Sequence, residues 1–152
     1  MLVELQCLLS KTVFGLPRRM PLGVDYNKLI LMIAVLEKRA YIPLYNQDVY
    51  LNAMGGIKLA EPSVDLAIIC SIASAFKEKA IPKTTAIFGE IGLTGEIRSV
   101  AQSDKRVNEC VKRGIKKVIL PYSNAKNLTA FKDKIELIGV KHVYEAIKIL
   151  FE

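Results

Sequence analysis

The pattern of apolar and polar residues along this chain predicts strands and helices in alternation. Polar and apolar residues alternate in the predicted strands, whereas apolar residues recur every three or four positions in the predicted helices. Strands are expected at residues 2–9, 48–53, 85–90, 117–120 and 135–138. Helices are expected at residues 25–40, 62–79, 103–113, 124–131 and 142–151. This order, without a repeat or a low-complexity linker, predicts one α/β domain over residues 1–152.

Local signals predict where several helices begin and end. Asp25 is a suitable N-cap for the first helix, and Ser103 is a suitable N-cap for the third. Pro62 can open the second helix because a first-turn residue does not need its backbone N–H. Gly114 is suited to end the third helix.

Two connections are rich in turn-forming residues. Gly92 and Gly95 bracket a hairpin-like turn. Residues 10–24 include glycines and prolines and predict an exposed loop, which contains Arg18 and Arg19.

The first two helices are apolar on nearly every side. The run Leu29–Leu36 holds eight apolar residues, too few to span a bilayer, so no membrane partner is expected. A helix without a polar face is buried on several sides. The burial comes either from the domain's own sheet or from a neighbouring subunit, and the pattern leaves both open.

The composition narrows the class of protein and its chemistry. With 51% hydrophobic and 24% charged residues among 152, the chain is globular and not intrinsically disordered. Cys7, Cys70 and Cys110 are widely spaced and His142 is the single histidine, so we expect no metal site. Scattered cysteines without a signal peptide predict a cytoplasmic protein. The chain has no P-loop motif with which to bind ATP.

The net charge of +7 is concentrated in one stretch. Residues 105–141 hold ten Lys and Arg against three acidic residues, an excess of seven. A basic surface favours a polyanionic partner, most simply nucleic acid. A solvated lysine-rich surface that serves solubility would give the same total, and charge alone does not choose between the two.

A glycine turn followed by a serine at the start of the second helix is the stretch with the most chemical content. Gly55-Gly56 precedes Glu61-Pro62-Ser63. The Ser63 hydroxyl would lie near free backbone N–H groups able to stabilise an oxyanion, which suits a nucleophile if a base is close. The same N–H groups make serine common in first turns that have no catalytic role.

Three separated motifs resemble the proteolytic domain of Lon proteases. Residues Gly55–Ala67 resemble the nucleophile segment of that family, and Phe88–Ile97 resemble its Thr-Gly-Glu-Ile-x-Leu-x-Gly turn. Residues Arg113–Pro121 resemble its Gly-Ile-Lys-x-Val motif. The resemblance covers roughly residues 47–152 and implies a Lon proteolytic-domain-like, ribosomal-protein-S5-domain-2-like fold, with a mixed sheet and flanking helices.

A closer resemblance extends over the whole chain. The runs Phe14–Arg19, Gly23–Leu29 and Ala34–Ala40 are similar to the C-terminal Lon-like domain of the RadA (Sms) family of bacterial DNA-repair and recombination ATPases. That family has a zinc finger and a RecA-type motor as well, so the resemblance implies a fragment of a larger DNA-dependent ATPase. ATP, Mg²⁺ and zinc are then expected only in the missing domains, and a recombinase is expected among the partners.

Lon peptidases use a Ser–Lys dyad, and the resemblance places Ser63 and Arg106 at its two positions. A guanidinium stays protonated near neutral pH and cannot serve as a base. Lys105 is turned by about 100° onto another face of the helix. Glu61 and Asp65 replace the glycines around the nucleophile, and Arg106 could pair with either acid. We expect a non-proteolytic domain without catalytic residues; the alternative is a Ser–Lys peptidase in which Lys105 or another lysine serves Ser63.

Assembly and DNA binding are the remaining uses that the resemblance implies. It implies a homo-oligomeric ring, expected to be hexameric. We expect phosphate contacts independent of DNA sequence, because aromatic residues do not interleave with the basic ones. The candidate DNA-binding residues are Arg18, Arg19, Lys38, Arg39, Lys105, Arg106, Lys112 and Arg113. A pure protein-interaction module with an acidic partner is a further alternative.

Overall fold

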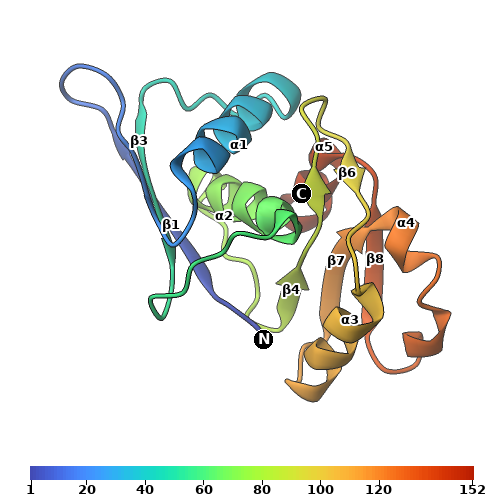
Figure 1. Cartoon of the computed structure of the whole chain (residues 1–152). Coiled ribbons are helices and arrows are strands. Elements are labelled where there is room, and N and C mark those ends of the chain that lie inside the picture. The colour runs from blue at the N-terminus through green and yellow to red at the C-terminus, as the bar shows by residue number, and fades with distance from the viewer.

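The computed structural model describes residues 1–152 and contains two three-stranded sheets and a two-stranded hairpin (Figure 1). The strands are β1 (Leu5–Lys11), β2 (Arg19–Leu22), β3 (Gln47–Ala53), β4 (Thr85–Ile87), β5 (Glu90–Ile91), β6 (Ile97–Arg98), β7 (Lys117–Pro121) and β8 (Glu136–Val140). The helices are α1 (Tyr26–Arg39), α2 (Asp65–Lys77), α3 (Ser103–Lys112), α4 (Tyr122–Ala125) and α5 (Val143–Phe151), with single 3-10 turns at Pro62–Val64 and Thr129–Phe131. The mixed α/β architecture predicted from the sequence is confirmed.

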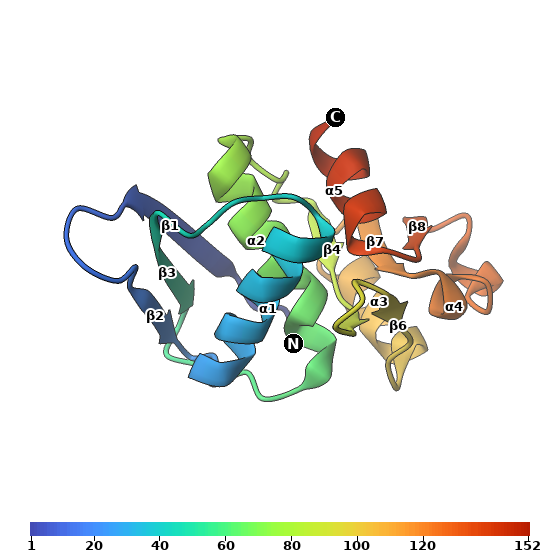
Figure 2. The same cartoon turned by 90° about the horizontal axis from the view of Figure 1, so that it is seen from above.

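The N-terminal sheet is covered by helices on one face only. Its strand order is β1-β3-β2, with β1 antiparallel and β2 parallel to β3. Helices α1 and α2 lie together against this sheet, and Figures 1 and 2 show no helix of the chain on its other face. Successive side chains of a strand point to opposite faces. Val49 and Leu51 of β3 are therefore buried completely, while Tyr50 between them is not.

The chain's own core accounts for most of the apolar character of the first two helices. The carboxylate of Asp25 caps α1 as predicted, accepting a hydrogen bond from the Lys28 N–H at 3.1 Å. Leu29 and Leu36 of α1 are fully buried, whereas Leu31 remains 44% exposed. Most of α2 is buried against β1, α1 and α5. None of the helices combines the length and the apolar surface that crossing a membrane requires.

The C-terminal sheet is parallel and has a core of its own. Its strand order is β4-β7-β8. Val107 and Cys110 of α3 pack with Val118 and Leu120 of β7 in a small cluster. Helix α5 then leaves this sheet and packs against α1 and α2, so that it contributes to the larger N-terminal core.

The predicted strand over residues 85–90 is wrong in one respect, because it is two strands. β4 pairs with β7 and β5 pairs with β6, with Gly89 between them. The Gly89 N–H donates to the Ser63 carbonyl at 2.8 Å and its own carbonyl accepts from the Leu66 N–H at 3.0 Å. Gly89 has a φ of 155°, which favours glycine. These two hydrogen bonds of Gly89 thus hold the break between β4 and β5 against the start of α2.

Strand β2 lies inside the segment for which a loop was predicted. Pro21 sits in it opposite Leu51. Because β2 is an edge strand, a proline can be accommodated where its missing N–H faces outward. The glycines and prolines on either side of β2 favour a loop, so the sequence pattern did not predict this strand.

Two helix predictions in the C-terminal half are also wrong in detail. The helix expected over residues 124–131 is instead α4 and a separate 3-10 turn, with buried Leu128 between them. Asn124 is held by Val100, whose N–H donates to its Oδ1 at 2.9 Å. Ser103 is the first residue of α3 and not its cap, because Gln102 enters the helix in the left-handed conformation.

Candidate functional site

Ser63 lies in the 3-10 turn that leads into α2 and is only 5% exposed. Pro62 opens this turn, so the second element begins where the sequence predicts but with a tighter first turn. The Ser63 hydroxyl makes one hydrogen bond, which it donates to the Glu61 carboxylate at 3.1 Å. The hydroxyl is thus directed at an acid and not at an amine.

Arg106 approaches the same carboxylate from α3. Its guanidinium donates to Glu61 Oε2 at 3.1 Å and to the Ala101 carbonyl at 3.0 Å. It also lies over the ring of Phe88, 5.9 Å from the centroid. The hydrogen bond from Arg106, followed by the hydrogen bond from Ser63, lowers the pKa of Glu61 below its usual value. Glu61 therefore links Ser63 and Arg106, two residues that are far apart in the sequence.

A second acid beside the serine turn is engaged by a lysine from α1. Asp65 is almost fully buried, lies 2.9 Å from Lys28 Nζ and accepts a hydrogen bond from the Ile91 N–H at 3.1 Å. Burial raises the pKa of Asp65, and the hydrogen bonds from Lys28 and Ile91 oppose that rise. This pair ties α1 to α2 and β5 and occupies the Lys28 amine.

This arrangement offers the serine a poor proton acceptor. A guanidinium has no lone pair available to take a proton. The Glu61 carboxylate, whose pKa is lowered, binds a proton weakly. A developing oxyanion beside Ser63 would also meet the negative charge of this carboxylate. No three His, Cys, Asp or Glu side chains gather closely enough to hold a metal ion.

The structure places the candidate DNA-binding residues at three separate locations. Arg18 and Arg19 lie at the end of the β1–β2 loop, and Lys38 and Arg39 lie at the end of α1. The other four, Lys105, Arg106, Lys112 and Arg113, belong to α3 or follow it directly. Figures 1 and 2 show α3 and the β1–β2 loop at opposite ends of the molecule. The eight residues therefore do not form one continuous surface within a single copy.

Half of these residues are engaged by the protein itself, and all four of those are arginines. Arg19 donates to the carbonyls of Gln47 and Leu44, and Arg39 donates to the Leu93 carbonyl at 3.3 Å. Arg113 pairs with Glu109, and Arg106 pairs with Glu61. The residues without an acidic or carbonyl partner are Arg18, Lys38, Lys105 and Lys112.

Two further lysines were missed from the sequence. Lys132 and Lys134 line a shallow cavity of about 490 Å³ together with Lys116. Asp133 and Glu136 line the same cavity and reduce its positive charge. The signal was available, because all three lysines belong to the basic stretch of residues 105–141.

Comparisons with known proteins show which family the chain resembles. Residues 41–152 match the Lon protease (S16) C-terminal proteolytic domain. The chain is 49% identical over 147 residues to the DNA repair protein RadA of Listeria monocytogenes serovar 1/2a, covering 97% of this chain and 32% of that protein. It is 50% identical over 148 residues to RadA of Halalkalibacterium halodurans, with the same shares covered.

A streptococcal relative gives the same result. DNA repair protein RadA of Streptococcus pyogenes serotype M3 is 47% identical over 150 residues, which cover 99% of this chain and 33% of that protein. The chain therefore spans about a third of the length of these curated relatives. We conclude that it belongs to the Lon protease C-terminal domain family, as a C-terminal Lon-like domain of the RadA type.

Proposed function

We propose that this chain is a non-proteolytic Lon-like domain that assembles into a ring and binds DNA without sequence preference. The observation that carries the proposal is the position of the Glu61 carboxylate between the Ser63 hydroxyl and the Arg106 guanidinium. A serine nucleophile must pass its proton to a base as it attacks. At this site a cation that cannot accept a proton stands where the Lon family resemblance places the lysine.

The peptidase alternative can be tested on an unfolded substrate. We expect the chain to cleave unfolded casein no faster than its Ser63→Ala variant does, because no amine serves the hydroxyl. Gel analysis over a long incubation measures the cleavage, and an active Lon protease is the positive control. Cleavage by the parent chain that is lost in Ser63→Ala would overturn the non-proteolytic proposal.

The free cations support DNA binding through phosphates. Lys105 and Lys112 are seven residues apart on α3, which places them two turns apart on one side of the helix, about 10 Å along its axis. Neither lysine has an acidic partner, and Lys116 follows just beyond the helix. Contacts of this kind position a protein on DNA without identifying bases.

A ring would compensate for the small number of free cations in each copy. Several weak sites held in one assembly bind a long polyanion more tightly by avidity. The three separate basic locations of one copy could also line up with those of its neighbours around a ring. We propose six copies, in keeping with the family resemblance.

The relatives named RadA suggest the setting in which the domain works. We propose that it is part of a cytoplasmic DNA-repair ATPase whose ATP, Mg²⁺ and zinc sites lie in other domains, with a recombinase as a partner. Three cysteines without disulfide bonds are in keeping with the reducing cytoplasm.

A further inference from the structure

The β1–β2 loop carries large apolar side chains at its tip that are almost fully exposed. Phe14 and Leu16 are each 89% exposed, and Val13 is 77% exposed. Figure 1 shows the loop extending beyond the end of the N-terminal sheet. Single exposed apolar residues are normal on protein surfaces, but a group of large ones on one projection marks a site of interaction.

The base of this loop is held firmly although its tip is free. Asp48 accepts hydrogen bonds from the Thr12 hydroxyl at 2.9 Å and from the Arg18 N–H at 2.8 Å. The Arg19 guanidinium adds bonds to two carbonyls beside β3. The apolar tip is therefore presented on a fixed support, which lowers the entropy that binding would cost.

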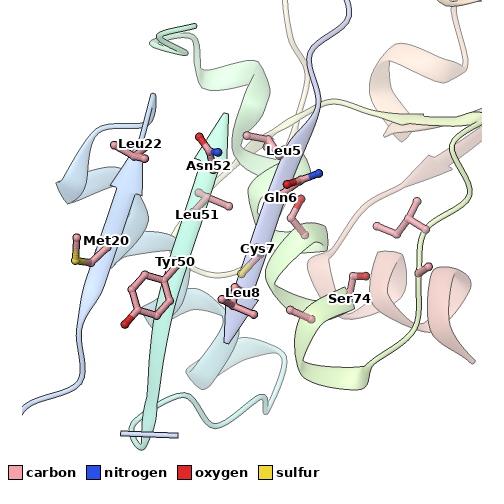
Figure 3. A pocket seen from close by; sticks show the side chains of 14 residues that line it. Leu5, Gln6, Cys7, Leu8, Met20, Leu22, Tyr50, Leu51, Asn52 and Ser74 are labelled. Carbon is pink, nitrogen blue, oxygen red and sulfur yellow. The ribbon is translucent and has the colours of Figure 1, made fainter. Parts of the chain in front are cut away.

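A groove of about 670 Å³ lies on the N-terminal sheet, away from the loop tip. Figure 3 shows its lining crossing all three strands, with Leu8 on β1, Tyr50 on β3 and Met20 on β2, and continuing past β1 to Ser74 on α2. Leu8 is 64% exposed, Met20 is 51% exposed and Leu22, which also lines the groove, is 67% exposed. The chain thus has an apolar projection and an apolar recess at different places on its surface.

The groove follows an unprotected sheet edge. β1 pairs only with β3, and the Glu4 carbonyl accepts from the Met54 N–H, so even-numbered residues of β1 direct their backbone groups to β3. The odd-numbered residues Leu5, Cys7 and Leu9 consequently leave their N–H and C=O groups unpaired at the edge. An exposed edge with apolar neighbours is a template for another chain.

The total exposed area is large enough to supply a stable interface. The chain exposes 8840 Å². A compact monomer of 16.9 kDa exposes about 7,700 Å². The excess of about 1,100 Å² exceeds the roughly 800 Å² that each partner contributes to a standard stable interface.

We propose that the β1–β2 loop tip of one copy docks in the β1–β3–β2 groove of the next copy. The inference rests on the proposed ring and names the surfaces that build it. A tip and a groove at different places on one chain make a head-to-tail contact, and such a contact builds a ring, not a symmetric dimer, when the rotation between neighbours closes. The occupant of the groove is thus a second copy of this chain.

Two double variants separate the two halves of this contact. Phe14→Glu/Leu16→Glu places charges on the apolar loop tip, and Leu8→Glu/Leu22→Glu places charges in the apolar groove. Leu93→Glu, at a residue that is 63% exposed elsewhere on the surface, is the matched control. Circular dichroism and thermal melting verify that each variant folds. Light scattering should give an oligomer for the parent chain and for Leu93→Glu, and 16.9 kDa for each double variant, with the dissociation constant raised at least about 100-fold.

An equal mixture of the two double variants gives the decisive result. One intact groove and one intact tip then remain, so the mixture should form a species of two chains and nothing larger. A mixture that stays monomeric would overturn the head-to-tail contact. Double variants that keep the parent's mass would overturn these surfaces while leaving the ring proposal intact. A parent chain of 16.9 kDa at every concentration would overturn both proposals.

Discussion

Arginine and lysine have different uses among the basic residues of this chain. Arg19, Arg39 and Arg106 donate to carbonyls or carboxylates from distant segments, whereas Lys105 and Lys112 reach solvent unpaired. A guanidinium has several donors in fixed geometry and suits such structural roles, while an ammonium on a flexible stem suits phosphate contacts. Arg18 is the exception, because only its backbone N–H is engaged.

The Asp65–Lys28 pair gives a pH-dependent prediction for stability. Burial raises the pKa of Asp65 in the folded state, so the folded chain binds a proton more readily than the unfolded one, and stability falls as the pH rises above the ordinary carboxyl range. Lys28→Met removes the opposing cation and should cost about 1–3 kcal/mol near neutral pH, since it leaves a buried carboxylate unpaired. The deficit should shrink on acidification into the ordinary carboxyl range, because protonation makes the buried carboxyl neutral.

Urea unfolding of both proteins across this pH range measures the effect. The double variant Lys28→Met/Asp65→Asn is the control, because it has no buried charge to leave unpaired. Its stability relative to the parent should change less with pH than that of Lys28→Met. A deficit of Lys28→Met that grows as the pH falls would contradict the predicted sign.

At the scale of elements, short segments of this fold depend on contacts with distant ones. The β5–β6 hairpin has two residues in each strand, too few to be stable alone. His142 connects its turn to α5: its Nδ1 accepts from the Tyr144 N–H at 3.1 Å, and its Nε2 donates to the Thr94 carbonyl at 3.0 Å. A single side chain thus caps the last helix and holds the hairpin turn.

Substitution of His142 should separate these two roles. His142→Ala should cost about 1–2 kcal/mol of unfolding free energy, because the cap and the bond to Thr94 are both lost. His142→Asn should cost less, since asparagine is a good N-cap but too short to reach Thr94. Urea denaturation measures both values, and equal losses in the two variants would show that the cap contributes nothing.

At the scale of the whole molecule, the fold distributes charge over three locations and apolar surface over two. No single copy offers a continuous basic face, so the proposed DNA binding would rest on weak and additive phosphate contacts and not on one fixed site. The affinity of such contacts falls steeply with salt, because each neutralised phosphate releases a counterion.

The proposed DNA binding should therefore depend on salt and on the α3 lysines. With about four phosphates neutralised, affinity for a random-sequence duplex should fall about 100-fold between 50 and 200 mM salt. Lys105→Glu/Lys112→Glu should weaken binding and reduce the salt slope by about two, since two phosphate contacts are lost. Lys58→Glu/Lys83→Glu, at two exposed lysines elsewhere, is the charge-matched control. Equal effects of the two pairs in filter binding would mean that only net charge matters.

Much of the fold was predictable because its signals are local. The cap at Asp25, the opening proline of the second element and the period of the core helices depend on neighbours in the sequence. Strand β2 and the break at Gly89 could not be predicted, because each is defined by its hydrogen-bond partners in distant strands and turns.

The candidate site divides in the same way. Sequence alone was enough to identify the family motifs, the replacement of a lysine by Arg106 and the excess of positive charge over residues 105–141. The folded arrangement was needed to show that Arg106 pairs with Glu61, that Asp65 pairs with Lys28, and which cations remain free. Composition only counts charges, whereas burial and the distance between segments decide which charges neutralise each other.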